Sequence, residues 1–525
     1  MLNNTLVILD LNKNYDLFEK KVKFVSLNKG LINLENCEQI YLKKFQKDKN
    51  NVYKKLLSVL LKVIPKNKKI PLIELEINNL RNDRYDFIDR IINLTIVKKI
   101  ILLGGFTKIK IISDNKSTLE IFDKLNIKIE KIDFSKKKKL NFFRLKLFKF
   151  YLKTLFVVIF LKFKKEDQIT KKKSEFFFSI HPNKFAYNKK NLDKEFFFNF
   201  LLTDETHLNH NIFKIFKIIK NNQFNNTINV ESFISIKYLL RLILKNIFVK
   251  INYDFHSNEL KFDGLDFNNE IKFFYISSLL NRFKLNIYEN AIKALLKKFD
   301  IQTVHMYLFE YSFGFYLINK IKNFSKKIMI IGYQHGVFSK NLMWLDFLGS
   351  IKNNKNYLPN KILALNIYSA RDYKEKLKKI PVKIPKEYAK KTKAFVDEIK
   401  IKKNSNNIIV LPGTHDISDL YYFFKNSENL KEKKFFFKLH PKNKFLFKNS
   451  RNIYAIKSHK IKDFSEIIIS QTSSLIYDFL KMKKFFFVVD FDYKSDLLNK
   501  KILNKTISLN RKKTHEKVIT FKIKK

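Results

Sequence analysis

Apolar residues follow two alternating patterns along the chain. Short runs rich in Val, Ile and Phe, such as "TLVILDL", are bounded by polar residues and predict buried strands. Between them, stretches such as "NVYKKLLSVLLKVI" repeat apolar residues every three or four positions, which predicts helices. Strands that alternate with helices are typical of α/β units with parallel sheets. We therefore predict an α/β fold.

The alternation divides the 525 residues into four segments. Residues 1–135 carry a small α/β pattern, and residues 136–173 hold an apolar, lysine-rich helix and a linker. Residues 174–345 and 346–525 each carry the pattern of a doubly wound unit, with the strand "LPNKILALN" opening the latter. In open α/β sheets ligands bind beyond the carboxyl ends of the strands. The polar residues that follow strands are therefore the candidates for function.

The segment Leu140–Lys165 is both apolar and basic. Its uninterrupted apolar part, Thr154–Leu161, is shorter than the roughly 20 residues that a membrane-spanning helix needs. With about 100° of rotation per residue, Lys146, Lys149 and Lys153 fall on one face, as in basic helices that lie on a membrane surface. A helix packed on a neighbouring unit, with its lysines in water, would show the same pattern.

The formal net charge of +56 raises the question of a nucleic-acid partner. Nine of the 105 basic residues are arginines, although the planar guanidinium is the group that reads bases and phosphates bidentately. Lys, Asn, Ile and Phe are all in excess, as A/T-rich codons alone would produce. We expect a solvated lysine surface that steers anions, and no nucleic-acid partner.

Cysteine usage and the N-terminus bear on the compartment. The single cysteine, Cys37, excludes an internal disulfide and favours a reducing environment. The N-terminal residues lack the basic start and the small-residue cleavage site of a signal peptide. We expect a cytoplasmic protein.

Three strand ends of the last segment carry residues suited to phosphate binding. They are a small-residue turn, a cation beside an imidazole, and a cluster of hydroxyls: Gly413 with Thr414, Lys438 with His440, and Ser473 with Ser474. Backbone N–H groups in a tight turn and hydroxyls at a helix N-terminus donate hydrogen bonds to phosphate oxygens. Each feature alone also fits an ordinary turn or helix cap. Their coincidence predicts a phosphate or nucleotide site.

The motifs, taken in order, resemble a known family. "FEYSF", "GYQHGVF", "KLHP" and the "TSS" cluster are similar to motifs of bacterial glycosyltransferases of GT-B type that build capsules and other surface carbohydrates, including sialyltransferases and polysialyltransferases. The resemblance covers about residues 174–495. It implies a GT-B-like pair of Rossmann-like domains facing a cleft, here with an extra N-terminal α/β domain. The C-terminal domain of the pair would hold the nucleotide sugar and the other domain the acceptor.

The resemblance also implies roles for individual residues. On the donor side, phosphate would contact Lys438 and His440, the phosphate or sugar would lie at Ser473 and Ser474, and the nucleotide pocket would be lined by Gly413 and Thr414. On the acceptor side, Glu310 would be the acidic residue and a candidate general base. Enzymes of this type commonly use no metal, so we expect neither a metal nor a cofactor beyond the nucleotide-sugar substrate.

The stretch "IIGYQHGVF" places two of the nine glycines of the chain four residues apart. We expect Gly332 to let the backbone leave its strand and Gly336 to let it pass close to a ligand. Gln334 and His335 would then point into the cleft, where His335 could polarise a phosphate or act as a base, because its ordinary pKa lies near neutrality. A buried histidine bonded to a loop carbonyl is the alternative.

Together these features predict a glycosyltransferase that moves a sugar to a capsule, O-antigen or lipopolysaccharide acceptor, lipid-linked or polysaccharide. The basic residues 140–165 would hold it at the anionic inner face of the cytoplasmic membrane. A polyol-phosphate transferase of teichoic-acid-like synthesis would use similar phosphate contacts. A non-catalytic polysaccharide-assembly protein would keep the sheets without the catalytic residues.

Overall fold

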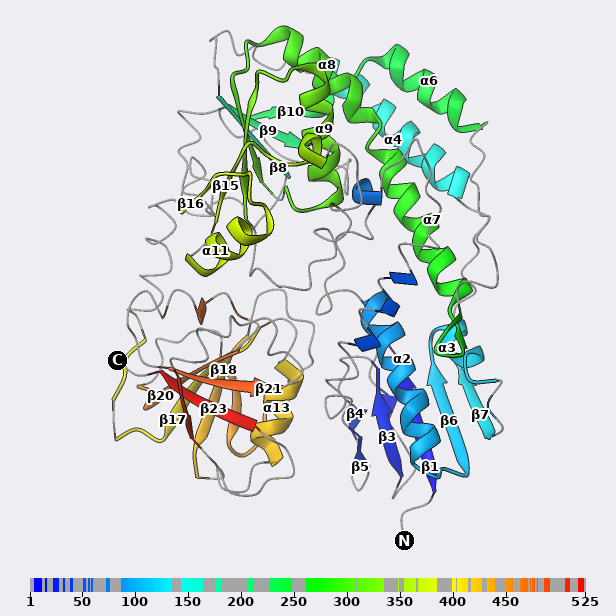
Figure 1. Cartoon of the computed structure of the whole chain (residues 1–525), viewed down its shortest axis with the longest axis vertical. Coiled ribbons are helices and arrows are strands. Elements are labelled where there is room, and N and C mark those ends of the chain that lie inside the picture. The colour runs from blue at the N-terminus through cyan, green and yellow to red at the C-terminus, as the bar shows by residue number, and fades with distance from the viewer. Residues whose placement is uncertain are drawn as a thin grey trace.

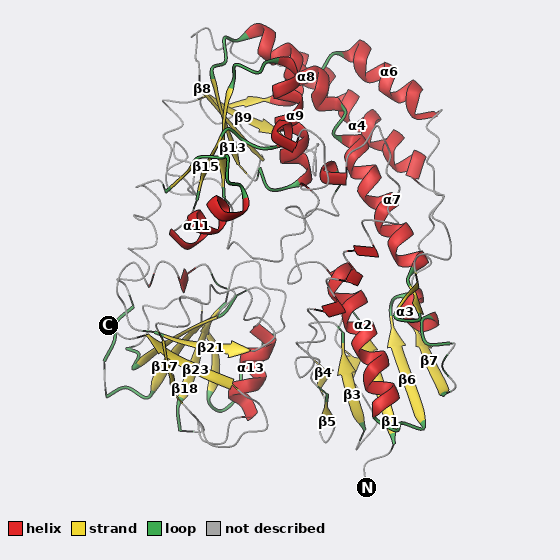
Figure 2. Ribbon diagram, viewed as in Figure 1, coloured by secondary structure: helices red, strands yellow, loops and turns green. Residues whose placement is uncertain are grey.

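The computed structural model is a mixed α/β structure with three large β-sheets that follow one another along the chain (Figures 1 and 2). It describes residues 4–11, 15–16, 22–27, 32–33, 38–40, 51–52, 55–56, 58–59, 72–75, 86–123, 125, 127–134, 143–163, 175–180, 206–210, 227–247, 261–307, 309–334, 348, 354–364, 367–384, 399–402, 404–413, 417–426, 432–439, 447, 449–456, 463–470, 473, 475–476, 479, 486–491, 506–509 and 518–523. The predicted α/β fold is confirmed.

The first sheet contains five parallel strands in the order β5-β3-β1-β6-β7. Its strands are β1 (Thr5–Asp10), β3 (Lys23–Ser26), β5 (Glu38–Gln39), β6 (Lys108–Ser113) and β7 (Lys128–Asp133). The helices α2 (Asp86–Leu103) and the short α3 (Lys116–Glu120) belong to this part of the chain. A small pair, β2 (Tyr15–Asp16) and β4 (Ile32–Asn33), stands apart from the sheet. We call this part the first unit.

The second sheet contains seven parallel strands in the order β10-β9-β8-β13-β14-β15-β16. They are β8 (Glu175–Ile180), β9 (Thr206–His210), β10 (Thr227–Asn229), β13 (Thr303–Tyr307), β14 (Met329–Tyr333), β15 (Lys361–Leu363) and β16 (Val382–Lys383). The helices of this second unit are α4 (Phe143–Phe163), α6 (Ile236–Ile247), α7 (Asn268–Lys284), α8 (Ile287–Lys298), α9 (Ser312–Phe324) and α11 (Ile367–Lys376).

Two features of the second unit differ from the sequence predictions. The strand in "LPNKILALN" is β15, and it pairs with β14, so it extends the second sheet and does not open the next unit at residue 346. The segment 136–173 also does more than link two units, because α4 packs against α6 and α7, and the Tyr151 hydroxyl donates a hydrogen bond of 2.8 Å to the Phe283 carbonyl. The second difference depends on contacts between residues distant in sequence, since Tyr151 and Phe283 are 132 residues apart.

The third sheet has the order β19-β18-β17-β20-β21-β23-β22. Its first five strands are parallel, and they are β17 (Asn407–Leu411), β18 (Lys434–Lys438), β19 (Ile453–Ile456), β20 (Glu466–Ser470) and β21 (Phe487–Phe491). Two antiparallel strands, β22 (Thr506–Leu509) and β23 (Val518–Ile523), complete one edge. The helix α13 (Ile417–Asn426) follows β17. This is the third unit.

The apolar runs of the third sheet are buried on both faces. In β17, Ile409 belongs to one cluster of buried side chains and Ile408 and Val410 belong to another, as the alternation of side chains in a strand requires. A strand covered on both faces must be apolar at nearly every position. This explains why the parallel strands appear in the sequence as continuous apolar runs.

The first and second units share one continuous cluster of buried apolar side chains, and a buried ion pair lies within the same region. Glu74, in the short 3-10 helix Leu72–Glu74, forms this pair with Arg282 of α7, and both side chains are buried. The guanidinium also lies 4.2 Å from the centre of the Tyr316 ring and donates a hydrogen bond of 2.7 Å to the Asn286 side chain. Since the Arg282 charge is compensated on several sides, this network can exist in the core.

A hairpin turn forms a second connection between these two units. The strands β11 (Lys261–Phe262) and β12 (Leu265–Asp266) are joined by Asp263 and Gly264, which both have positive φ, 47° and 73°. An Asp-Gly pair favours this type of two-residue turn. The Lys98 ammonium of α2 donates a hydrogen bond of 2.6 Å to the Asp263 carbonyl. The end of the hairpin therefore contacts the first unit.

Replacement of Glu74 by Gln would leave the Arg282 guanidinium buried without its counter-charge. We expect Glu74→Gln to lower the free energy of unfolding by about 3–5 kcal/mol. The matched control is Glu120→Gln, which removes the exposed ion pair between Lys116 and Glu120 in α3 and should cost about 0.5 kcal/mol or less. Chemical denaturation followed by circular dichroism measures both; equal losses in the two variants would contradict this role for the buried pair.

Candidate functional site

The strand order creates the same feature in all three sheets. The first strand of each unit lies inside its sheet, so β1 stands between β3 and β6, β8 between β9 and β13, and β17 between β18 and β20. The chain first builds the sheet outward on one side of this strand and then continues on the other side. Ligands bind in open α/β sheets at such points, where the connections diverge at the carboxyl ends of the two strands. Each unit therefore has one position at which a ligand site is expected.

In the third unit, this position contains Gly413 and Lys438, two of the residues that the sequence singled out, together with Ser470, which ends the strand before the "TSS" cluster. β17 ends at Leu411 and leads into the buried Gly413, while its neighbour β20 ends at the buried Ser470. β18 pairs with β17 on the other side and ends on the half-buried Lys438. A glycine, a cation and a hydroxyl therefore lie at or just beyond the carboxyl ends of three adjacent strands.

Ser473 continues from the end of β20. Its backbone N–H donates a hydrogen bond of 2.9 Å to the Ser470 carbonyl, and its side-chain oxygen accepts one of 3.3 Å from the Leu475 N–H. The Ser473 hydroxyl therefore caps the turn that follows β20. This is the helix-cap alternative that the sequence leaves open for the "TSS" cluster. The predicted partners Thr414, His440 and Ser474 lie outside the described residues.

In the second unit, Glu310 and Gln334 both contact α11. Glu310 follows β13, is buried, and accepts a short hydrogen bond from the Tyr373 hydroxyl. Gln334 follows β14, is 1% exposed, and its side-chain amide donates a hydrogen bond of 3.1 Å to the Ser369 hydroxyl. The sequence predicts that Gln334 points into a cleft. In the structure its side-chain amide instead bonds to Ser369 and so attaches α11 to the sheet.

Sequence reasoning missed Ser369 and Tyr373. The signal available was the polar content of "NIYSARDYKEK", a helix that follows a strand, but nothing in it indicates which strand end these side chains meet. The predicted His335 and Gly336 lie outside the described residues.

Gly332 has a different role from the one predicted. It lies inside β14, not at its end, and a Cβ at this position would lie 2.7 Å from Phe309 Cδ1 and 2.7 Å from Pro359 Cγ. Real side chains essentially never approach so closely, so the residue must be glycine for packing reasons. Phe309 directly precedes Glu310, and the missing side chain therefore allows the residues after β13 to pack tightly on β14.

His305 lies within β13, two residues before the end of that strand. Its Nδ1 is 2.8 Å from the Tyr333 hydroxyl, and its Nε2 is 3.9 Å from a carboxylate oxygen of Glu175. Burial lowers the pKa of His305 because desolvation disfavours the charged imidazole, and this effect outweighs the attraction of the Glu175 carboxylate. The imidazole is therefore neutral in the folded protein at neutral pH.

This pKa shift predicts a dependence of stability on pH. Below about pH 6.5 the unfolded chain protonates His305 while the folded protein resists it, so the free energy of unfolding falls as the pH falls. We expect His305→Gln, which can still accept the Tyr333 hydrogen bond, to lose less thermal stability than the wild type between pH 7.5 and 5.5. Parallel melting curves test this; identical pH dependence in both proteins would contradict it.

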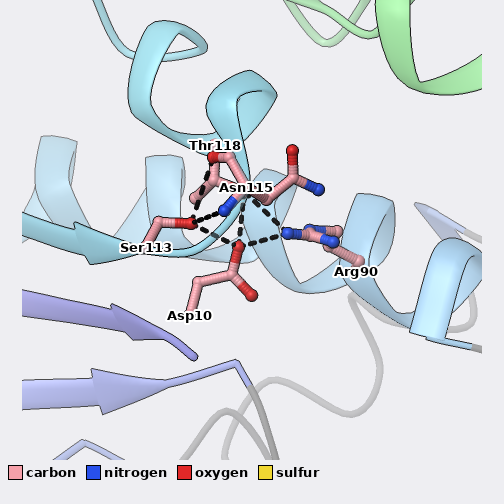
Figure 3. Close-up of polar contacts among 5 residues, drawn as sticks. All are labelled: Asp10, Arg90, Ser113, Asn115 and Thr118. Carbon is pink, nitrogen blue, oxygen red and sulfur yellow. Dashed lines mark hydrogen bonds and ion pairs between the residues drawn. The ribbon is translucent and has the colours of Figure 1, made fainter. Parts of the chain in front are cut away.

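The first unit contains a buried polar cluster that sequence reasoning also missed (Figure 3). Asp10 ends β1 and is 1% exposed; it forms an ion pair with Arg90 of α2 and accepts hydrogen bonds of 3.0 Å from Ser113 and 2.6 Å from Thr118. The Ser113 side-chain oxygen also accepts a hydrogen bond of 2.9 Å from the Asn115 N–H. The Asp10 carboxylate thus connects the ends of β1 and β6 to α2 and α3. Its role is structural.

Among the described residues, no three His, Cys, Asp or Glu side chains gather in a way that could hold a metal ion. None of the helices that the structure describes is long and apolar enough to cross a bilayer. The sequence matches no protein-family model and no curated protein. The candidate site therefore rests on the fold and on its own residues, with the strongest set at the carboxyl ends of β17, β18 and β20.

Proposed function

We propose that this protein is a glycosyltransferase of GT-B type that binds a nucleotide sugar at the carboxyl edge of the third sheet. The observation that supports this most strongly is that Gly413, Lys438 and Ser470 lie at or just beyond the carboxyl ends of three adjacent strands. These strands are β17, β18 and β20, and the connections diverge between β17 and β20. A diphosphate needs donors and positive charge in a confined space. The backbone at Gly413, the Lys438 ammonium and the serines that end and follow β20 are groups of this kind.

These groups share one task in the transfer, the stabilisation of the leaving phosphate. The acceptor oxygen attacks the anomeric carbon of the donor sugar while the bond from that carbon to the phosphate oxygen breaks. The negative charge that develops on the leaving phosphate is stabilised by Lys438 and by N–H and hydroxyl donors of the turns after β17 and β20. Fixed donors are effective here because they need no reorganisation during the reaction.

On the acceptor side, we propose the second unit, with Glu310 or His335 as the base that takes the proton of the acceptor hydroxyl. Glu310 is bonded to Tyr373, so this role requires that contact to open when the acceptor binds. The product is an extended capsule, O-antigen or lipopolysaccharide chain on a lipid-linked or polysaccharide acceptor. The reaction would take place at the inner face of the cytoplasmic membrane.

The phosphate contacts also fit a polyol-phosphate transferase, whose donor is a CDP-linked polyol. The two reactions differ in the donor that binds and in the bond that breaks. A donor screen therefore separates them: nucleotide sugars support glycosyl transfer, and selective binding of a CDP-linked polyol supports the alternative.

A thermal-shift screen against CMP, UDP, GDP, CDP and their conjugates tests the donor site. We expect one nucleotide class to stabilise the wild type, and Lys438→Ala to weaken its binding by about 10- to 100-fold, which is the usual effect of losing a charge-assisted hydrogen bond. The matched control is Lys434→Ala, because Lys434 is exposed at the opposite end of the same strand, β18. It should bind as the wild type does.

Two results would count against the donor site. One is folded wild-type protein that no nucleotide or conjugate stabilises. The other is an equal loss of binding in Lys434→Ala and Lys438→Ala, because that would indicate a general effect of positive charge and not a site at the carboxyl edge.

A further inference from the structure

The helix α4 carries a stripe of large apolar side chains that face away from the core. The residues of this stripe are Leu145, Leu152, Phe156, Ile159 and Phe163. Their spacings of seven, four, three and four residues place them on one face of a helix. Two of them are strongly exposed, Phe156 at 60% and Phe163 at 84%.

The opposite face of α4 is buried. It contains Phe143, Leu147, Tyr151, Thr154, Val157, Val158 and Leu161. α4 is therefore apolar on both faces, whereas a helix at the surface of a water-soluble protein usually has polar residues on its outer face. An exposed apolar stripe of this length marks a surface that contacts something other than water.

Cations line both sides of the stripe. Lys146 and Lys149 are exposed along one side, and Arg144 and Lys162 are exposed along the other. The sequence continues this charge beyond the helix, with four consecutive lysines at 136–139 and three at 171–173. An apolar stripe between two rows of cations is the pattern of helices that lie in the head-group region of an anionic membrane.

The neighbouring helix α6 has exposed residues of the same two kinds. α6 packs beside α4 (Figure 2). The Asn246 side-chain amide donates a hydrogen bond of 3.1 Å to the Arg144 carbonyl. Leu240 and Leu244 are exposed on α6, one turn apart. The exposed cations Lys237, Arg241 and Lys245 stand beside them. Both helices thus combine exposed apolar residues with flanking positive charge.

The positive charge beside the stripe favours a membrane over a protein as the partner of this surface. If a second copy of this chain covered the surface symmetrically, the rows of cations would meet each other, and like charges in contact are unfavourable. Lysine is also depleted at the core of protein interfaces. Anionic lipid head groups complement the cations, while the acyl region accepts the apolar stripe.

We propose that α4 and α6 together form a docking surface for an anionic lipid membrane. The stripe on α4, with Leu240 and Leu244 of α6, inserts into the boundary between head groups and acyl chains. The flanking lysines and arginines contact the lipid phosphates. This inference is independent of the nucleotide site, because it uses different residues and a different ligand.

Co-sedimentation with lipid vesicles tests the proposal. Because a chain with a net charge of +56 can adhere to anionic lipid through any basic surface, the test compares variants that leave the charge unchanged. The double variant Phe156→Ser with Phe163→Ser removes the most exposed part of the stripe. The matched control, Leu102→Ser with Leu103→Ser, removes two exposed apolar residues at the end of α2, of which Leu103 is 81% exposed.

The vesicles contain phosphatidylglycerol and phosphatidylethanolamine in equal parts, and assays run at about 0.1 M and at about 0.5 M salt, where exposed charges are screened more strongly. We expect the Phe156/Phe163 variant to bind about tenfold or more weakly than the wild type at both salt concentrations. The Leu102/Leu103 control should bind as the wild type does. Vesicles of phosphatidylcholine alone, which carry no net charge, should bind the wild type much more weakly.

Several outcomes would overturn the proposal. They are a wild type that does not sediment with the anionic vesicles, equal binding by the two double variants, and equal binding of the wild type to phosphatidylcholine. A wild type that is dimeric in sedimentation velocity, with a monomeric Phe156/Phe163 variant, would show that a second copy occupies the surface instead.

A fluorescence measurement gives an independent readout. In Phe163→Trp, the new indole should shift its emission to the blue when the anionic vesicles are added, because it leaves water for the head-group region. In Leu103→Trp, vesicles should leave the emission of the new indole unchanged. The natural Trp344 is present in both proteins and serves as a common background. Equal shifts in the two variants would contradict insertion through α4.

Discussion

The central position of the first strand in each sheet is the constraint on which the rest of this structure depends. β1, β8 and β17 each pair in parallel with a strand on both sides. Parallel pairing requires that every connection return to the amino end of the sheet, so the polar residues after the strands collect at one edge. The apolar runs fill the cores, and polar residues are left to gather at that edge.

The three units use this edge differently. In the first unit, Asp10 binds Arg90, Ser113 and Thr118, so the polar groups serve the fold. In the second unit, Glu310 and Gln334 bind residues of α11. In the third unit, Gly413, Lys438 and Ser470 lie at the edge, and this is the set for which we propose a phosphate ligand. This difference is the reason for placing the donor in the third unit.

Much of the fold could be predicted from the sequence because it depends on local patterns. Buried parallel strands are continuous apolar runs, so β1, β17, β18 and β20 could be predicted. Gly413 and Lys438 lie at strand ends, as the sequence indicates, and Ser473 follows the end of β20; their phosphate-binding role stays a prediction. The sheet to which a short strand belongs was harder to predict from the sequence. β15 has three residues, and such a short apolar run does not indicate whether it pairs with the strands before it or after it.

The remaining features depend on contacts between distant residues. Asp10 and Arg90 are 80 residues apart, and Glu310 and Tyr373 are 63 apart, so neither pair has a local signature. The sequence suggests that Gly332 lets the backbone leave its strand, although close packing against Phe309 explains it. In α4, periodicity could not identify the outer face, because both faces are apolar. The exposure of Phe156 and Phe163 emerges only when the helix packs on its neighbours.

The most direct test of the central claim is to locate a bound nucleotide on the chain. Photo-crosslinking with an azido derivative of the nucleotide that binds best, followed by peptide mapping, would report which of the three edges holds it. We predict labelled peptides that contain residues 411–413 or 470–473, with labelling suppressed by excess unmodified nucleotide. Suppressible labelling near Asp10 or near Glu310 instead would contradict the placement of the donor site in the third unit.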